Sequence, residues 1–519
     1  MDSAGAVNAS RKLVAATKRR STAAVQDAGA HSFAPRAVAA IATWLASFAI
    51  ALFPIASEAA EAPGTPEITK VEPFVWSVGS TNAVTIEGKN FGNVRRLWTS
   101  RHGVLTAAQL TAVVEDEGKR LKLTAPIDGR EAAGPFAVRV ITDGGISAPV
   151  MALLEELPEL KPSTNALLSG TGYLMETIRT GAGNRHRVRL KQNEKITFEV
   201  VAGRFGSKLD PVLRVLDARG KEVFHGQDTA GLGVDCRASL VATTAGEHTL
   251  EIRDAAYESG TQQQYQLRLL RGAPATRRLP ASAVRGDAAA PPLFDGLFRG
   301  PAETNLHQLK IDRPGSYRFT ATSRRLGGAC DPVLRLKSAD GARLKDSHFF
   351  NLEPVISHEF KEPGTYLLES WDAAGQFGPD ATYVVTTELG PAEFALNTET
   401  DSLRIPVGGE VELSVTIDRD GYDGPVRFGL AHGPEGVELA DMVAKEKTKE
   451  AKFKIKLAGS LAPGTTFPLK ISGRRGEGEN APKTPLYTSA YWKKRFPDLY
   501  SPMFEFEDTV WVTVLPPKD

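Results

Sequence analysis

Apolar and polar residues alternate with a period of two along most of the chain. Such alternation is typical of strands that bury one face against a core. Sustained helical periodicity is missing after residue 60, and the best short helix candidate is 438–447. The alternating segments that we expect to form strands are 84–86, 136–140, 196–200, 265–269, 411–417 and 453–457.

Glycine-containing turn signals separate these segments at short intervals, as at Asp143-Gly144-Gly145, Asp340-Gly341 and Asp420-Gly421. Many short strands joined by such turns favour β-sandwiches. The predicted fold is therefore all-β, with tandem β-sandwich modules of immunoglobulin-like and jelly-roll-like type after a signal peptide.

Proline-rich stretches at 157–163 and 272–292, and the Gly390-Pro391 pair, mark the expected module boundaries. The pieces between them have about 90 to 125 residues, the usual size of one sandwich. The expected modules are 66–155, 165–271, 290–390 and 391–517.

The two middle modules repeat each other. Segment 204–215 aligns with 325–336, so that Asp210-Pro211 matches Asp331-Pro332. At the same offset Asn184-Arg-His186 matches Asn305-Leu-His307, and 254–256 matches 372–374 after a slip of three residues. The sequence therefore contains two consecutive copies of one module.

This repeat resembles the bacterial pre-peptidase C-terminal (PPC) domain, through residues 204–220 and 246–254. The resemblance implies a β-sandwich of the kind found beside secreted peptidases and in bacterial surface proteins. The chain departs from the family at 184–186 and 305–307, where Asn-x-His replaces an Asp-x-aromatic signature.

The outer modules carry resemblances of their own. The first is similar to an IPT/TIG domain, an immunoglobulin-like sandwich, through 66–73, 84–92 and 134–145. The last resembles the immunoglobulin-like modules that end many secreted planctomycete proteins, through 407–409 and 419–437. Neither resemblance implies a catalytic centre.

The N-terminal segment predicts export. A basic stretch that includes Arg11 and Arg36 precedes an uncharged apolar run at 37–57, and small residues follow at Ser57 and Ala59. This order is that of a secretory signal peptide over residues 1–59. The alternative is a retained membrane anchor, because the run is just long enough to span a bilayer. The expected location is periplasmic, cell-surface or extracellular.

Composition excludes several classes of protein. The 519 residues include 63 basic and 62 acidic ones, a net charge of +1, which gives no broad basic footprint for nucleic acid. The only cysteines, Cys236 and Cys330, exclude a disulfide scaffold and a cysteine-rich zinc site. They form either a disulfide between modules or two isolated buried thiols, and we favour the thiols.

The one metal considered is calcium, which prefers oxygen ligands from loops. Four aspartates of the first repeat could supply them, whereas the second repeat keeps only Asp331 among the matching positions. Some of the four also suit simple roles in turns and strand starts. The candidate ligands are Asp210, Asp217, Asp228 and Asp235. No other cofactor is expected.

Histidine chemistry is not predicted. The chain has neither a His-Glu-x-x-His motif nor a Gly-x-Ser-x-Gly motif. His186 and His307 occupy one repeated position within strands, which favours a shared scaffold role. We therefore expect no enzyme.

Aromatic residues are dense near the C-terminus, with lysines and an arginine among them. Aromatics beside cationic side chains are common at binding surfaces. The alternative is a long loop that packs its rings over the last sandwich. The candidate partner-binding residues are Tyr491, Trp492, Phe496 and Tyr500.

These features predict a non-catalytic, exported binding or scaffold protein of the cell envelope or extracellular space. Its expected partner is a protein or polysaccharide of the envelope, with no nucleic acid and no membrane contact beyond the N-terminal segment. The alternative is a non-catalytic accessory subunit of a secreted peptidase or other hydrolase. An enzyme with an unrecognised site is a third possibility, which would need convergent polar groups in a pocket.

Overall fold

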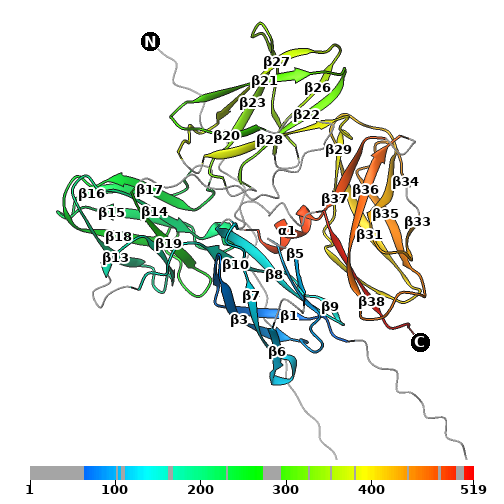
Figure 1. Ribbon diagram of the computed structural model, residues 1–519, viewed down its shortest axis with the longest axis horizontal. Helices are drawn as coiled ribbons and strands as arrows, with labels where there is room; N and C mark the ends of the chain where they lie inside the picture. Colours follow the sequence, from blue (N-terminus) through cyan, green and yellow to red (C-terminus); the bar gives the residue numbers. More distant parts are fainter. Residues whose placement is uncertain are drawn as a thin grey trace, which may run out of the picture. The chain divides into compact units, whose positions relative to one another are not determined.

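A computed structural model describes residues 63–518 with several gaps (Figure 1). The expected signal segment, residues 1–59, lies outside the described residues. Within the described ranges, none of the helices has the length and apolar content that a membrane span requires. The gaps are 101–102, 107–110, 132, 162–166, 230–231, 273–293, 325–327, 351–352, 379–380, 441–442, 477–480 and 498–507.

The first module consists of two sheets, with strand orders β1-β3-β7-β6 and β2-β10-β8-β4-β5, and β9 pairs with β8. Trp76, Phe91 and Phe136 are the largest residues of its core. Its elements are β1 (Glu67–Glu72), β2 (Val75–Ser77), β3 (Thr81–Lys89), β4 (Arg96–Thr99), β5 (Gly103–Thr106), β6 (Thr111–Glu115), η1 (Asp116–Gly118), β7 (Arg120–Pro126), β8 (Gly134–Thr142), β9 (Gly145–Ile146) and β10 (Val150–Glu155).

The second module pairs the sheets β11-β13-β18-β15-β16 and β12-β19-β14-β17 around a core that includes Phe198 and Tyr265. Its elements are β11 (Leu167–Leu168), β12 (Gly172–Thr177), β13 (Asn184–Leu190), β14 (Lys195–Val201), η2 (Gly203–Phe205), β15 (Pro211–Leu216), β16 (Glu222–Gly226), β17 (Cys236–Val241), β18 (Gly246–Asp254) and β19 (Gln264–Arg271).

The third module has the sheets β21-β27-β23-β24 and β20-β28-β22-β26-β25. Strand for strand, β21-β27-β23-β24 reproduces β13-β18-β15-β16, and β20-β28-β22-β26 reproduces β12-β19-β14-β17. The sequence repeat is thus also a repeat of topology. The elements are β20 (Phe294–Leu297), β21 (Thr304–Ile311), β22 (Gly315–Thr322), β23 (Pro332–Ser338), β24 (Arg343–Asp346), β25 (His348–Phe350), β26 (Glu353–Phe360), β27 (Gly364–Asp372) and β28 (Thr382–Leu389).

The fourth module is one continuous system of paired strands, in the order β30-β38-β36-β37-β29-β31-β35-β33, with β32 pairing β34 and β36. Its elements are β29 (Phe394–Asn397), β30 (Ser402–Pro406), β31 (Glu410–Arg419), β32 (Val426–His432), β33 (Val437–Ala440), β34 (Val443–Ala444), β35 (Glu450–Leu457), β36 (Thr466–Arg475), β37 (Lys483–Tyr487), α1 (Ser489–Arg495) and β38 (Val510–Leu515).

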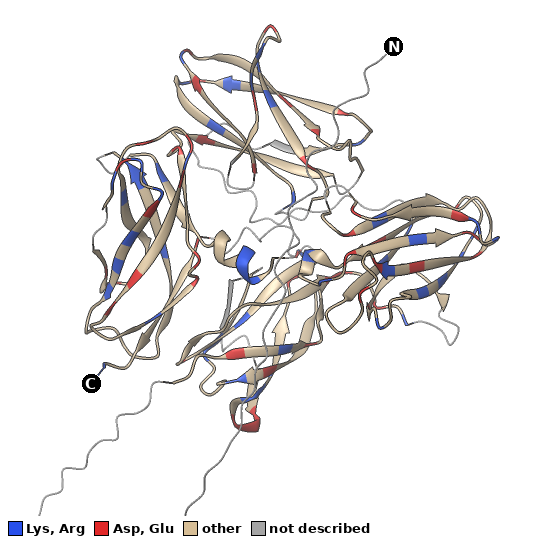
Figure 2. Ribbon diagram, turned by 180° about the vertical axis from the view of Figure 1, so that it is seen from behind, with Lys and Arg blue, Asp and Glu red and all other residues tan. Residues whose placement is uncertain are grey.

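The all-β tandem-sandwich fold is confirmed, and the alternation explains it. In β31, Leu413, Val415 and Ile417 are buried while the residues between them are exposed. Basic and acidic residues are interspersed along the strands (Figure 2). The short helix candidate at 438–447 is wrong, because its first residues lie in β33, where Glu438 pairs with Lys456 and Ala440 with Lys454.

Candidate functional site

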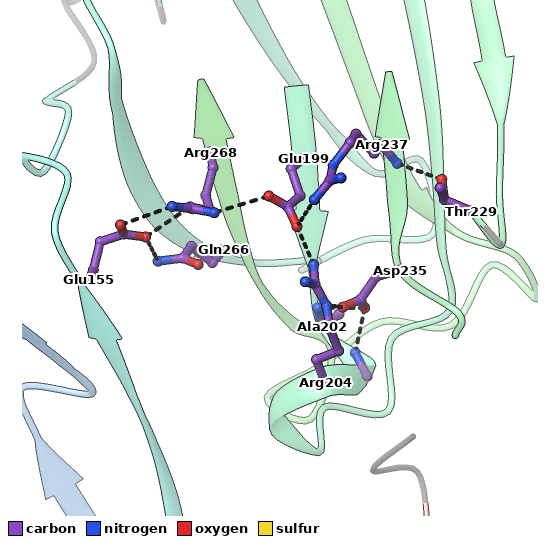
Figure 3. Close-up of polar contacts among 10 residues, drawn as sticks. Glu155, Glu199, Ala202, Arg204, Thr229, Asp235, Arg237, Gln266 and Arg268 are labelled. Carbon is purple, nitrogen blue, oxygen red and sulfur yellow. Dashed lines mark hydrogen bonds and ion pairs between the residues drawn. The ribbon is translucent and has the colours of Figure 1, made fainter. Parts of the chain in front are cut away.

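A buried charge network lies on the outer face of the sheet β12-β19-β14-β17 (Figure 3). The strand alternation turns Phe198 and Val200 into the core, so that Glu199 points to the opposite face. Arg237 and Arg268 are its direct neighbours on the two flanking strands. The network contains three carboxylates and three guanidiniums: Glu155, Glu199, Asp235, Arg204, Arg237 and Arg268.

Glu199 is the centre of this network. Its Oε1 accepts from Arg237 Nη2 at 3.0 Å and from Arg204 Nη2 at 2.5 Å, and its Oε2 accepts from Arg268 Nη1 at 3.1 Å. Arg204 Nε also donates to Asp235 Oδ2 at 2.6 Å. Asp235 Oδ1 accepts from the backbone amides of Ala202 and Gly203, both at 2.8 Å.

Burial and the neighbouring charges together shift the pKa values of the carboxyl groups in this network. Burial by itself raises the pKa of Glu199, but Arg237, Arg204 and Arg268 outweigh it and hold that pKa well below its usual range. Burial raises the pKa of Asp235, and Arg204 and the two backbone amides act in the opposite sense. Glu199 is 1% exposed and Asp235 0%, so these groups do not face solvent.

The first module completes the network. Glu155, at the end of β10, accepts from Arg268 Nη2 at 3.2 Å and from Gln266 Nε2 at 3.0 Å. Beside this polar contact, Val75 and Leu153 of the first module pack with apolar residues of the second: Tyr173, Val201 and Phe205. The outer sheet face of the second module is therefore covered by the first module, and the network is a clamp between the two.

The equivalent sheet face of the third module carries different residues. Thr320 stands at the position of Glu199, with Thr386 and Val355 as its flanking neighbours. Two residues earlier in the same strand, and on the same face, Arg318 is 7% exposed. Its Nη2 donates to Asp420 Oδ2 of the fourth module at 3.1 Å. Both copies thus place this face against a neighbouring module, through different charged residues.

A third contact joins the first and fourth modules. The ion pair of Arg139 and Asp401 spans 2.7 Å, and the two side chains are 2% and 6% exposed. A cluster of aromatic and apolar residues surrounds it: Trp98, Ala137, Ile141, Ile146, Met151, Trp492 and Trp511.

This cluster includes part of the aromatic segment that the sequence marks as partner-binding. Trp492, in α1, is 2% exposed, so its ring is not available as an open stacking surface in this structure. Tyr491 and Phe496 are partly buried against the same cluster, and burial raises the pKa of Tyr491 to about 12. Tyr500 lies outside the described residues. The packing alternative describes Trp492 better, with Trp98 of the first module as one of the partners.

The four aspartates of the calcium hypothesis do not converge. Asp217 Oδ1 accepts from the backbone amides of Arg219 and Lys221, and so closes a turn, while Asp235 belongs to the buried network. Burial, followed by Asp228 and Asp254, raises the pKa of Asp210. Among the described residues, no three His, Cys, Asp or Glu side chains are grouped as metal ligands. The structure therefore does not group these four aspartates as one site, and calcium binding stays a prediction.

The repeated histidines have a common environment that sequence reasoning described only in part. His186 Nε2 lies 3.1 Å from the Tyr265 hydroxyl, to which Asn184 donates at 2.9 Å. Asn305, His307 and Tyr383 repeat the arrangement, at 2.9 Å and 3.4 Å. Burial lowers the pKa of both histidines. The sequence analysis did not identify Tyr265 and Tyr383 as an equivalent pair. The alignment of 254–256 with 372–374, after a slip of three residues, also aligns these two tyrosines.

The two cysteines are free and buried. Cys236 Sγ contacts the Pro211 carbonyl oxygen at 3.1 Å, and Cys330 Sγ contacts Ser323 Oγ at 3.0 Å. Burial raises the pKa of both thiols, that of Cys330 to about 12. They are isolated thiols, as the sequence favoured.

No family model and no curated protein matches the chain. One similar solved structure, described as a complex with a xylogluco-oligosaccharide, has 12% identity and TM-score 0.18, and covers 40% of this chain and 58% of its own. The chain thus spans less than two thirds of that structure.

A second is SGBP-B of the Bacteroides ovatus mixed-linkage glucan utilization locus, in complex with a mixed-linkage heptasaccharide, at 12% identity, TM-score 0.16 and coverages of 62% and 73%. A tandem from titin has 9% identity, TM-score 0.12 and coverages of 82% and 98%. Likeness this weak carries no argument about function.

Proposed function

We propose that the protein is a non-catalytic, exported scaffold and binding protein of the cell envelope or extracellular space. The observation that carries the proposal is the set of buried charged contacts between modules. Glu155 with Arg268, Arg139 with Asp401 and Arg318 with Asp420 each join two modules through groups that are largely removed from water.

Such contacts favour fixed module positions over a flexible string. Domains within a chain move relative to one another by default unless their interface is large and well packed. A buried ion pair adds little net stability, but a shifted arrangement that keeps one charge buried without its partner costs about 3–5 kcal/mol, which disfavours alternative packed arrangements. A scaffold that presents ligands at fixed positions needs this restriction.

The role in the envelope rests on the sequence. The N-terminal segment favours export, and the resemblances to IPT/TIG and PPC domains favour accessory binding modules. Residues 60–519, tagged and incubated with envelope and secreted fractions of the source organism, should retain an envelope polysaccharide or protein as identified by mass spectrometry and sugar analysis. Because the aspartates do not converge, EDTA should not change the result.

A second experiment compares the unaltered chain with a double variant, Arg268→Ala and Arg318→Ala, in which two of the contacts between modules are weakened. Small-angle scattering should show a larger radius of gyration for this variant than for the unaltered chain. Equal radii would contradict the scaffold proposal. Stoichiometric retention of a hydrolase would instead support the accessory-subunit alternative.

A further inference from the structure

A tyrosine in the second module occupies a backbone conformation that suits glycine. Tyr257 has φ +61°, in the left-handed region that L side chains rarely adopt. Among the described residues glycine fills most such positions, the others hold asparagine, acidic residues, one alanine and one lysine, and Tyr257 is the one aromatic residue. The residue is nevertheless 61% exposed, so burial in a core does not explain its presence.

The third module provides an internal comparison for this turn. Asp254 Oδ1 accepts from the amides of Ala256 and Glu258, and Asp372 Oδ1 accepts in the same way from Ala374 and Gln376. The position of Tyr257 is then that of Gly375, which has φ +71°. The same turn is therefore built with glycine in one copy and with an exposed tyrosine in the other.

The tyrosine ring is oriented by a neighbouring cation. The Arg253 guanidinium lies over the ring at 4.5 Å from its centroid, and the residue remains largely exposed. The loop beneath is fixed by backbone hydrogen bonds from Gly260 to Ile178 and from Lys208 to Gln262, at 2.8 and 3.1 Å. An oriented aromatic face on a fixed loop is a preformed platform.

We infer that Tyr257 and Arg253 form a stacking platform for a neutral sugar ring of an envelope polysaccharide. A pyranose offers an apolar face to an aromatic ring and hydroxyls to the donors beside it, and tyrosine and arginine supply both. The residues after Tyr257 are exposed and mostly polar: Glu258, Ser259, Thr261 and Gln262. A protein interface would need a larger apolar centre than this single ring.

This inference deepens the proposed function by naming its ligand class. The test uses residues 60–519 and immobilised neutral polysaccharides: a β-glucan, an α-mannan and a galactan. The unaltered chain should bind at least one of them. Tyr257→Asn, which suits a positive φ, should weaken that binding at least tenfold without lowering the melting temperature, whereas Tyr257→Phe should retain it.

Val241→Thr is the matched control, because Val241 is an exposed apolar side chain of the same module, 55% exposed. It should leave binding unchanged. Binding to none of the three polysaccharides, or equal binding by Tyr257→Asn, would overturn the platform. If Tyr257→Asn binds equally well but the chain still retains envelope material, the proposed scaffold function is not contradicted. A clear fall in melting temperature for Tyr257→Asn would show a structural role and would also overturn the inference, as would loss of an envelope protein instead of a polysaccharide.

Discussion

Replacing Glu199 with glutamine should strongly destabilise the second module. The substitution keeps the shape of the side chain but removes one of three negative charges that balance three buried guanidiniums. Breaking a buried ion pair by removing one partner costs about 3–5 kcal/mol. For a module of this size, about 1 kcal/mol shifts the melting temperature by roughly 4–8 °C, so the expected fall is more than 10 °C.

The pH dependence of stability gives an independent readout. The folded pKa of Glu199 lies well below its usual value, so its contribution to stability is present above the unfolded pKa, near 4.3. It is lost as the pH falls through the folded pKa. The unaltered chain should therefore lose stability below about pH 4.3, and Glu199→Gln should remove part of that loss.

Hydrogen exchange of peptides that cover β14 and β19 measures this module within the full chain, and calorimetry records the transition. The matched control is Glu222→Gln, because Glu222 is 43% exposed and pairs with Arg214 in the same module. Surface pairs contribute at most about 1 kcal/mol. The reasoning is refuted if Glu199→Gln behaves like Glu222→Gln, or if its stability falls with acid as steeply as that of the unaltered chain.

Three further predictions concern the contacts between modules and the thiols. Asp401→Asn, which leaves Arg139 buried without its charge partner, should raise hydrogen exchange in β8 and β30, and no change there would contradict a fixed contact between the first and fourth modules. Trp492→Ala should cost about 3–5 kcal/mol, measured by denaturant unfolding, because it opens a cavity in a buried cluster; an unchanged midpoint would point back to a surface role. Cys236 and Cys330 should react with a thiol reagent only after unfolding, because both are buried thiols with raised pKa values, and rapid labelling of the native chain would refute this.

Strand positions and the repeat could be predicted because they depend on local pattern. The alternation in 196–200 and 411–417 is produced by the core that each strand faces, and β14 and β31 follow it. The repeat was predictable for the same reason, since two copies of one topology need matching apolar positions and turns.

The candidate site could not be predicted, because coverage by a distant module leaves no local pattern. A polar residue on the strand face opposite the core is normally expected to be exposed to solvent. Glu199 is nevertheless 1% exposed, because the first module covers it. Trp492 has Trp98 in its cluster, far away in the sequence. The aspartates were grouped by their spacing along loops, whereas the turns direct Asp217 to backbone amides and Asp235 to Arg204.

Comparison of the two copies of the repeat distinguishes residues that both sandwiches share from residues found in one copy alone. In both copies an asparagine and a histidine lie beside the hydroxyl of a buried tyrosine, Tyr265 in one and Tyr383 in the other. We therefore assign these residues to the scaffold.

The copies differ at Glu199, which is replaced by Thr320, and at Tyr257, which is replaced by Gly375. The third module has the same strand order without either residue, so the sandwich topology does not require them. Glu199 balances the arginines beside the contact with the first module, and Tyr257 is the exposed residue at positive φ to which we assign the stacking platform.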